Sequence, residues 1–342
     1  MSGKMQYNVA LDMGTSGVRM ALKGHGVIYQ QSSAIAMRGG EMLATGNEAL
    51  RLLARTPAEI AVRFPMLSGT VADEQALFSW LKYLVRYAQM GGQRGKPKLL
   101  FSVPPKIQPA PLRHLLALAM EAGAGSCAAV GSDLAAGIGA PVDIHATKCA
   151  MICQLGAGMI GVSAICAGRV VYARTLPFGM ALLDEAIVRQ MRKKYGMMIS
   201  AKGAEELKLL LCNANGASAP SVNMAALDGK TGFPREFSVQ SEDLKDAAAS
   251  ILDQFCQLID QVLLALPEQM SADVGEGGLV LCGGGAQLFG LAQRIADEFS
   301  LACHLVEDPA ASTIRGLSKM IESKDKYDEL VMEQQRILRQ DT

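Results

Sequence analysis

MICQLGAGMIGVSAI, residues 151–165, places Gly156, Gly158 and Gly161 directly after an apolar run. This spacing is that of the dinucleotide-binding fingerprint, which needs a helix after the glycines and an acidic residue about 20 positions further on. The chain instead continues with a second apolar run, a turn at 167–169 and a third apolar run. Apolar runs joined by a glycine turn predict a β-hairpin. We therefore interpret the glycines as a strand-to-strand turn, whose backbone N–H groups can still surround an anion.

A second hairpin of this kind is expected near the N-terminus, where residues 9–22 read VALDMGTSGVRMAL. Asp12 ends its first strand, and a carboxylate beside a phosphate-binding turn can hold Mg²⁺ through water. Thr15 and Ser16 offer hydroxyl and N–H groups to the same ligand. The alternative is an ordinary hairpin in which Asp12 and Thr15 only satisfy the turn. Two such hairpins predict duplicated halves that hold one phosphate chain.

The length and composition limit the class of protein. The 342 residues leave room for two domains or one large duplicated domain. Half of the residues are apolar but only 5% are aromatic, which predicts an aliphatic core. The 33 basic and 33 acidic residues leave no net charge, which argues against nucleic acid as the main partner.

The eight cysteines form no C-x-x-C pair, although His145, Cys149 and Cys153 are spaced by four. The run from Cys149 predicts a strand and no fourth ligand is near, so we expect reduced core cysteines rather than zinc or disulfides. The N-terminus is too short and polar for a signal peptide. No apolar run approaches the ~20 residues of a membrane-spanning helix. These features predict a soluble, cytoplasmic protein.

Apolar spacing predicts most of the helices. They are expected at 74–90, 111–122, 182–195, 204–211 and 241–266, with Ser241 as the N-cap of the last. Residues 216–235 are polar and rich in turn-forming residues, which predicts a surface insertion. The charged tail, 323–342, predicts a solvated helix. The Gly-Lys pairs at 95–96 and 229–230 lack the context of a P-loop.

Residues 278–286, GLVLCGGGA, predict a strand, three glycines and a helix from about residue 288. Glycines at the carboxyl end of a strand allow a ligand to approach the backbone closely. Tight packing of the strand against the helix would explain one of the three glycines but not all of them. The pattern therefore favours a ligand.

Two strand–turn hairpins and a strand–GGG–helix segment resemble the layout of the actin-like ATPases, which sugar kinases and heat-shock chaperone ATPases share. Within that group, residues 7–322 most resemble the MreB family, the bacterial actins of rod-shaped cells. The resemblance is densest at residues 11–15, 46–49, 55–57, 65–73, 135–140, 184–187, 204–208, 282–286 and 307–309. It implies an α/β, actin-like two-domain fold, a duplicated RNase H-like fold with four subdomains around a nucleotide cleft. Domain I would comprise 1–141 plus 317–342 with a small subdomain near 33–72, and domain II would comprise 142–316 with a small subdomain near 180–250.

The resemblance also implies ATP and Mg²⁺ as ligands, and assigns residues to them. The first phosphate loop would be formed by Asp12, Gly14, Thr15, Ser16 and Gly17, with Asp12 holding Mg²⁺ through water; the second would contain Gly156, Ala157 and Gly158; the adenosine side would be lined by Glu205, Glu206 and Lys208 and by Gly283, Gly284, Gly285, Ala286 and Gln287.

The second phosphate loop departs from the family. Where MreB proteins have Asp-Ile-Gly-Gly-Gly-Thr-Thr, residues 154–160 read QLGAGMI, so Gln154 replaces the Asp. Where they have Glu-Glu-Pro-Met, residues 131–134 read GSDL, which leaves Asp133 as the one candidate acid. The family's Gly-Gly-Asp has become residues 179–181, GMA. Losing an activating carboxylate typically costs ~10²–10⁴-fold in rate, so the sequence predicts ATP binding with weak or no hydrolysis.

The resulting hypothesis is an MreB-like cytoskeletal filament protein with a cell-shape or scaffold role. Its implied partners are further copies of itself, other MreB-like proteins and the cell-wall machinery. The main alternative is an active MreB-type ATPase that works through Asp12 and Asp133, and a small-molecule kinase of the same superfamily is less favoured because the chain is short for one. A basic loop at 89–98 with Met90 predicts at most weak contact with anionic membranes, at ~1 kcal/mol per Lys or Arg.

Overall fold

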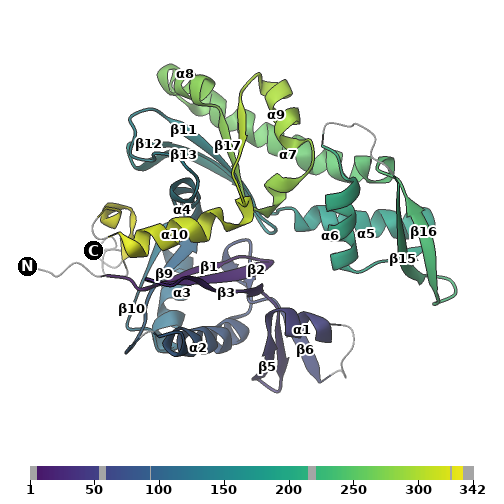
Figure 1. The fold of residues 1–342 in the computed structure, drawn as a ribbon, viewed down its shortest axis with the longest axis horizontal. Helices are drawn as coiled ribbons and strands as arrows, with labels where there is room; N and C mark the ends of the chain where they lie inside the picture. The colour runs from purple at the N-terminus through teal and green to yellow at the C-terminus, as the bar shows by residue number, and fades with distance from the viewer. Residues whose placement is uncertain (1–5, 54–58, 93, 215–220, 324–325, 334–342) are drawn as a thin grey trace, which may run out of the picture. The chain divides into compact units, whose positions relative to one another are not determined.

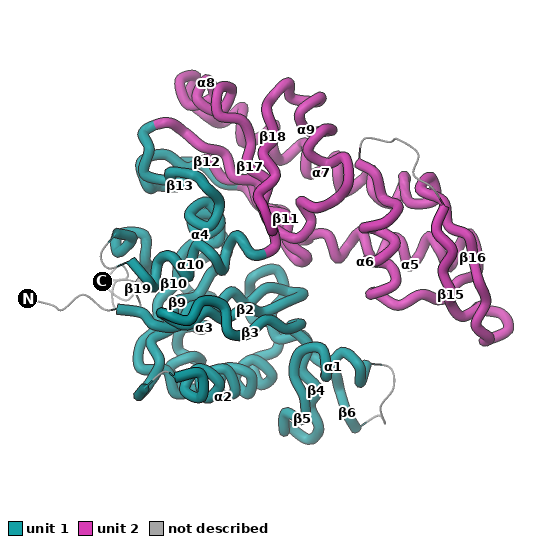
Figure 2. Tube along the Cα trace, in the orientation of Figure 1, with its two compact units in different colours: residues 1–147, 165–173, 311–342 teal, residues 148–164, 174–310 magenta. Residues whose placement is uncertain are grey.

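The computed structural model describes residues 6–53, 59–92, 94–214, 221–323 and 326–333 (Figure 1). The chain forms two compact units (Figure 2). Unit 1 comprises residues 1–147, 165–173 and 311–342, and unit 2 comprises residues 148–164 and 174–310.

The main sheet of unit 1 has six strands in the order β19-β10-β9-β1-β2-β3. At its centre β1 (Val9–Met13) pairs antiparallel with β2 (Gly17–Leu22), which confirms the predicted N-terminal hairpin. The other strands are β3 (Gly26–Ser32), β9 (Lys98–Val103), β10 (Ser126–Gly131) and β19 (Met332–Glu333). β1 runs parallel to β9, and Leu11 pairs with Phe101. Asp12 and Ser102, the next residues of the two strands, therefore lie side by side.

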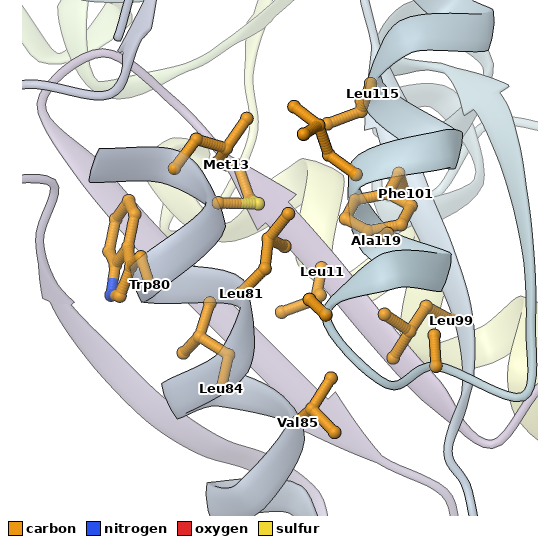
Figure 3. Close-up of a cluster of buried hydrophobic side chains, with 14 of the residues drawn as sticks. Leu11, Met13, Trp80, Leu81, Leu84, Val85, Leu99, Phe101, Leu115 and Ala119 are labelled. Carbon is orange, nitrogen blue, oxygen red and sulfur yellow. The ribbon is translucent and has the colours of Figure 1, made fainter. Parts of the chain in front are cut away.

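The core of unit 1 lies between this sheet and two helices, α2 (Glu74–Met90) and α3 (Pro109–Glu121) (Figure 3). Asp73 begins α2 by accepting the N–H of Ala76 at 2.9 Å. Helical spacing then puts Trp80, Leu81, Leu84 and Val85 on one face of α2, and all are buried. They pack with alternate residues of β1 and β9, namely Leu11, Met13, Leu99 and Phe101. Burial of each such side chain contributes about 1.5–3 kcal/mol.

Two helices lie on the opposite face of the sheet, α4 (Ser132–Gly139) and α10 (Ser312–Glu322) (Figure 1). A Cβ atom on Gly139 would lie 1.8 Å from the Ser312 carbonyl oxygen, and one on Gly316 would lie 1.7 Å from that of Ala135. The two helix backbones are therefore in direct contact. This close packing is why only glycine fits at these two positions.

The remaining elements of unit 1 form a small α/β group. Strands β4 (Ile35–Arg38), β5 (Glu41–Thr45) and β6 (Ile60–Arg63) make a three-stranded sheet beside α1 (Gly46–Leu52). Its core is a cluster of small side chains, Ala34, Ala36, Ala44 and Ala49. A two-stranded hairpin, β7 (Met66–Leu67) and β8 (Thr70–Val71), precedes α2.

The main sheet of unit 2 has five strands in the order β13-β12-β11-β17-β18. The hairpin of β11 (Ala150–Leu155) and β12 (Ile160–Cys166) confirms the interpretation of residues 151–165 as strand, turn and strand. The other strands are β13 (Arg169–Leu176), β17 (Leu279–Cys282) and β18 (Cys303–Leu305). The helices of the unit are α5 (Ala181–Tyr195), α6 (Ala201–Leu211), α7 (Glu242–Ala265), α8 (Glu268–Gly277) and α9 (Leu291–Phe299). The end of β12 and most of β13 are grouped with unit 1.

Three local predictions are wrong. The supposed insertion at 216–235 contains β15 (Val222–Asp228) and the start of β16 (Pro234–Val239), which form a sheet with β14 (Met197–Met198). Most of its described polar side chains are exposed, although Asp228 is buried. Ser241 has helical backbone angles and makes no side-chain cap. In the described part of the tail, residues 328–333 form a 3₁₀ turn and β19 rather than a helix, because β19 pairs with β10.

Candidate functional site

The turn between β1 and β2 in unit 1 is shaped by its backbone. The Gly14 N–H donates to the Gly17 carbonyl at 2.9 Å, and a Cβ atom on Gly14 would lie 3.1 Å from that oxygen. The hydroxyl oxygen of Thr15 accepts the Ser68 N–H at 3.0 Å, and Ser33 donates to the Gly14 carbonyl at 2.6 Å. Among the described residues, the N–H groups of Thr15 and Ser16 meet no acceptor. Contacts with Ser33 and Ser68 thus fix the turn, and the two N–H groups are left to donate to an anion.

Asp12, at the end of β1, is committed to neighbouring side chains. Ser102 donates its hydroxyl to one carboxylate oxygen of Asp12 at 2.7 Å. Arg19, opposite Asp12 in the β1–β2 register, has Nη1 4.0 Å from the other oxygen. Burial raises the pKa of Asp12, while the Ser102 hydrogen bond and the Arg19 charge oppose that rise. Sequence reasoning missed both partners, although the antiparallel pairing of Asp12 with Arg19 follows from the length of the turn.

The turn between β11 and β12 in unit 2 is fixed by different contacts. The Gly156 N–H donates to the Met159 carbonyl at 2.9 Å, as the equivalent bond does in unit 1. The carbonyls of Gly156 and Ala157 then accept the N–H groups of Met180 and Ala181, each at 2.9 Å, at the start of α5. Backbone packing onto α5 therefore replaces the side-chain bonds seen in unit 1. The Ala157 and Met159 N–H groups meet no acceptor within the described ranges, so this turn can also accept an anion.

The glycines after β17 divide into two kinds. Gly283 has φ 84°, and a Cβ atom there would lie 2.4 Å from the Leu155 carbonyl oxygen. A Cβ atom on Gly285 would lie 2.3 Å from Cγ of Met180. Packing therefore explains two of the three glycines, rather than one. Gly284, Ala286 and Gln287 continue the same 3₁₀ turn, in which Gly284 and Gln287 are exposed and Ala286 is buried.

Unit 2 brings several predicted site residues together. The turn at 156–158, the start of α5 and the glycines at 283–285 are in contact. The segment after α6 joins them, because the Ala214 N–H donates to the Phe289 carbonyl at 2.8 Å. Gln154, at the end of β11, pairs with Cys282 of β17. The turn at 156–158 and the glycines at 283–285 therefore both pack against the residues around the start of α5 and the end of β11.

On α6 the three predicted contact residues differ in exposure. Glu205 and Glu206 are exposed, whereas Lys208 is buried. Its ammonium lies 2.7 and 3.0 Å from the two carboxylate oxygens of Asp184 on α5. Burial raises the pKa of Asp184, and Lys208 opposes that rise. Lys208 is therefore first of all a partner in a buried ion pair, and Asp184 is a charge that sequence reasoning did not place at the site.

Asp133, the candidate acid, lies in the first turn of α4 and is 2% exposed. Its carboxylate accepts the Leu134 N–H at 2.9 Å. Every residue of α4 is buried. This position suits a carboxylate that stabilises the start of a helix, and it offers no open face to a water molecule.

The described residues limit metal and membrane chemistry. Over those ranges, no group of three or more His, Cys, Asp or Glu side chains could hold a metal ion. Nor does any described helix combine the length and apolar character needed to cross a membrane. In the predicted lipid-contact loop Met90 is 85% exposed, while residue 93 lies outside the described residues.

Comparison with known proteins covers nearly the whole chain. Residues 6–329 match the family model of the MreB/Mbl protein. The chain is 26% identical over 322 residues to the cell shape-determining protein Mbl of Bacillus subtilis, covering 93% of this chain and 97% of that protein. It is 27% identical over 333 residues to the cell shape-determining protein MreB of Escherichia coli K12, covering 95% and 96%.

Solved structures show the same fold. MreB5 of Spiroplasma citri bound to ADP superposes with a TM-score of 0.86 at 24% identity, covering 93% of this chain and 97% of that one. The same protein bound to AMPPNP gives a TM-score of 0.84. The MamK double helical filament gives 0.80 at 18% identity, covering 92% and 99%. The fold is therefore the α/β actin-like fold expected from the sequence.

Proposed function

Because the chain belongs to the MreB/Mbl family, we propose that it is a cytoskeletal filament protein with a cell-shape or scaffold role that binds an adenine nucleotide and turns it over slowly or not at all. One observation carries the second half of this proposal. Within the part of the chain that the structure describes, both hairpin turns keep backbone N–H groups that meet no acceptor, whereas the acidic side chains expected around them are replaced, buried or bonded to other side chains. Nucleotide binding needs the backbone N–H groups, which are present, whereas hydrolysis needs accessible acidic side chains, which are not available here.

The residues present fit a nucleotide. Each unit, taken by itself, presents backbone N–H groups that suit phosphate oxygens: those of Thr15 and Ser16 in unit 1, and those of Ala157 and Met159 in unit 2. The exposed Glu205, Glu206, Gly284 and Gln287 lie on elements that unit 2 brings together and are available to the adenosine moiety. ADP and AMPPNP are the nucleotides bound by MreB5 of Spiroplasma citri, which supports the same class of ligand here.

The residues do not fit Mg²⁺ in the manner expected from the sequence. Asp12 already accepts a hydrogen bond from Ser102 and faces the Arg19 guanidinium. A cation of like sign beside Arg19 would be repelled, and Gln154 offers no charge to offset this. We therefore assign no step of the function to a metal held by Asp12.

Weak hydrolysis follows from the same side chains. An attacking water needs an accessible base within hydrogen-bond reach. Gln154 cannot accept a proton as a carboxylate does, and Asp133 is 2% exposed in a fully buried helix. Without such a base the rate is expected to fall by ~10²–10⁴-fold. The alternative, an active ATPase that works through Asp12 and Asp133, requires both carboxylates to change partners.

Self-association is the remaining part of the proposal. In unit 1, Leu53, which follows α1 of the small α/β group, is 48% exposed, and Leu67 on β7 is 55% exposed. In unit 2, Leu210 of α6 is 62% exposed and Phe233, between β15 and β16, is 74% exposed. Such exposed apolar side chains are available for contact with another copy of the chain. The MamK filament, which shares the fold, supports assembly of this chain with further copies of itself.

Other parts of the sequence hypothesis stay proposals. They are the duplicated halves at 1–141 plus 317–342 and 142–316, a cytoplasmic location, contact with other MreB-like proteins or cell-wall machinery, and weak membrane contact through Met90 and its basic neighbours. Lipid co-sedimentation with anionic vesicles tests the last of these. A Met90→Glu variant should reduce any binding, and an unchanged bound fraction would remove the loop from the proposal.

The decisive experiment combines ATP affinity by calorimetry with phosphate release on the same sample. We expect binding with release at least about 10²-fold slower than in an active relative assayed in parallel. Release at the relative's rate would establish the active ATPase instead. Sedimentation with and without ATP then tests assembly, and Leu210→Glu is expected to reduce the pelleted fraction while leaving ATP affinity unchanged.

A further inference from the structure

Arg19 occupies an unusual position beside the phosphate-binding turn of unit 1. It lies on β2, one pair of residues beyond the pair that closes the turn, directly across from Asp12. Its side chain is 19% exposed, and Nη1 is 4.0 Å from the Asp12 carboxylate. This distance permits attraction between the charges but exceeds that of a hydrogen bond. The buried Nε–H of Arg19 has no hydrogen-bond partner among the described residues.

A buried guanidinium N–H without an acceptor costs free energy, so native structures rarely keep one without a use. The Nε–H itself is buried, so a ligand would meet Arg19 through its terminal amino groups, one of which lies 4.0 Å from the Asp12 carboxylate, in the place where Asp12 was expected to hold a divalent cation. Guanidinium groups match phosphate oxygens in geometry and stay charged at all relevant pH values. Ser102 contributes by fixing the orientation of Asp12, which in turn positions Arg19.

We infer that Arg19 supplies the positive charge that neutralises the nucleotide phosphates, so that nucleotide binding does not depend on a divalent cation. This inference rests on the proposed binding of an adenine nucleotide and names the residue that makes it metal-independent. Asp12 acts as a positioning residue for Arg19 rather than as an anchor for Mg²⁺. A turn with free N–H groups and an adjacent guanidinium then forms a complete phosphate site within unit 1.

A purely structural role for Arg19 explains less. An ion pair built only for stability would bring the two groups to hydrogen-bond distance and satisfy more of the guanidinium donors. Here one carboxylate oxygen bonds to Ser102, and Arg19 stays at 4.0 Å from the other. Both partners are about one-fifth exposed, so the pair is open to a ligand.

The test measures ATP and ADP affinity of the full chain by calorimetry in EDTA and again with Mg²⁺. We expect the wild-type affinity for each nucleotide to change less than about threefold between the two conditions. Arg19→Met should weaken binding in EDTA by about tenfold to a hundredfold, as expected when one charged hydrogen bond is lost. Arg86→Met removes an exposed arginine of α2 in the same unit and should leave affinity unchanged.

Asp12→Asn gives a second, independent readout. It removes a negative charge beside the phosphates, while the Asn side-chain oxygen can still accept the Ser102 hydrogen bond that orients this position, so metal-free affinity should rise; if Asp12 instead anchored Mg²⁺, affinity in the presence of Mg²⁺ would fall. Thermal melting checks that each variant is folded. Wild-type binding that needs Mg²⁺ would overturn this inference and leave the proposed function intact. Absence of nucleotide binding in both conditions would overturn the proposed function, and this inference with it.

Discussion

The turns at 14–17 and 156–159 share one backbone motif and differ in what surrounds it. In both, the first glycine donates its N–H across the turn at 2.9 Å. In unit 1 the turn is held by side chains, with Ser33 and Thr15 forming its hydrogen bonds and the Asp12 carboxyl group close to it in sequence. In unit 2 the turn is held by the backbone of α5, and Met159 and Ile160 stand where MreB proteins have two threonines.

This difference separates the shape of a phosphate turn from its chemistry. The geometry that presents N–H groups depends on glycine and on hydrogen bonds behind the turn, and both halves retain it. The acidic groups that would polarise water are side chains, which can be replaced without altering the backbone. A chain can therefore keep nucleotide binding in both halves while losing catalysis in one.

The largest effect is expected from replacing a glycine that packs against the turn of unit 2, and it is compared with the same replacement in the turn of unit 1. A Cβ atom on Gly179 would lie 2.3 and 2.6 Å from the carbonyl oxygens of Gly156 and Ala157, which are backbone atoms that cannot easily move. We expect Gly179→Ala to lower the free energy of unfolding by about 3 kcal/mol. Gly14→Ala meets its nearest atom only at 3.1 Å and should cost about 1 kcal/mol. Urea denaturation of both variants measures the difference.

Gly275→Ala is the matched control in unit 2, since nothing lies within 4 Å of a Cβ atom there. It should be neutral or stabilise the protein by up to about 1 kcal/mol, because alanine favours helix. If Gly14→Ala cost as much as Gly179→Ala, the two turns would be equally dependent on backbone packing. The comparison between them would then fail.

The next prediction concerns the buried charge that unit 2 keeps near its turn. Lys208→Met leaves Asp184 buried without its partner, and we expect a loss of about 2 kcal/mol at neutral pH, below the full cost of breaking a deeply buried pair because Asp184 is 16% exposed. Burial already raises the pKa of Asp184 in the folded protein. A carboxyl group whose pKa is higher in the folded than in the unfolded state lowers the stability of the protein as pH rises. The loss of unfolding free energy in Lys208→Met should therefore shrink as pH falls towards about 4, the pKa of Asp in the unfolded chain.

Lys202→Met on the same helix is the control, because its pairing with Glu206 at 4.0 Å is exposed and contributes less than about 1 kcal/mol. Chemical denaturation across pH measures both variants. A deficit for Lys208→Met that stays constant with pH would show that lost packing, rather than the uncompensated Asp184 charge, is responsible.

Local signals in the sequence predicted many of the individual elements, whereas the two-domain fold was implied by the resemblance to the MreB family. The apolar runs joined by glycines in 151–165 and the helical spacing in 74–90 each specify local structure without reference to distant residues. The missed hairpin at β15–β16 lacks such a signal, since its sheet is small and much of its surface is exposed. The fit of Gly139 and Gly316 depends on two helices 177 positions apart in the chain, which no local pattern encodes.

The candidate site was predictable as a set of turns but not as a set of charges. The glycines and the loss of the acid at Gln154 can be read directly from the chain. Whether Asp12 and Lys208 are available to a ligand depends on Ser102, Arg19 and Asp184, which meet them only through strand register and helix packing. The packing role of Gly283 and Gly285 likewise depends on contact with Leu155 and Met180.

The smallest effect is expected from restoring one carboxylate beside the turn of unit 2. This change tests whether Gln154 alone accounts for the catalytic difference between the two turns. Gln154→Asp restores a carboxylate of similar reach at the end of β11, where the backbone already matches that of unit 1. Met159 and Ile160 remain beside this residue, and Asp133 remains buried, so the variant still lacks an accessible base. Phosphate release should therefore rise less than about tenfold. Gln287→Glu, an acid placed on the exposed 3₁₀ turn of the same unit, controls for a general effect of added charge. A rise of ~10²-fold or more in Gln154→Asp alone would mean that the catalytic difference between the two halves resides in that residue, and that the turn in unit 2 has kept everything else that hydrolysis needs.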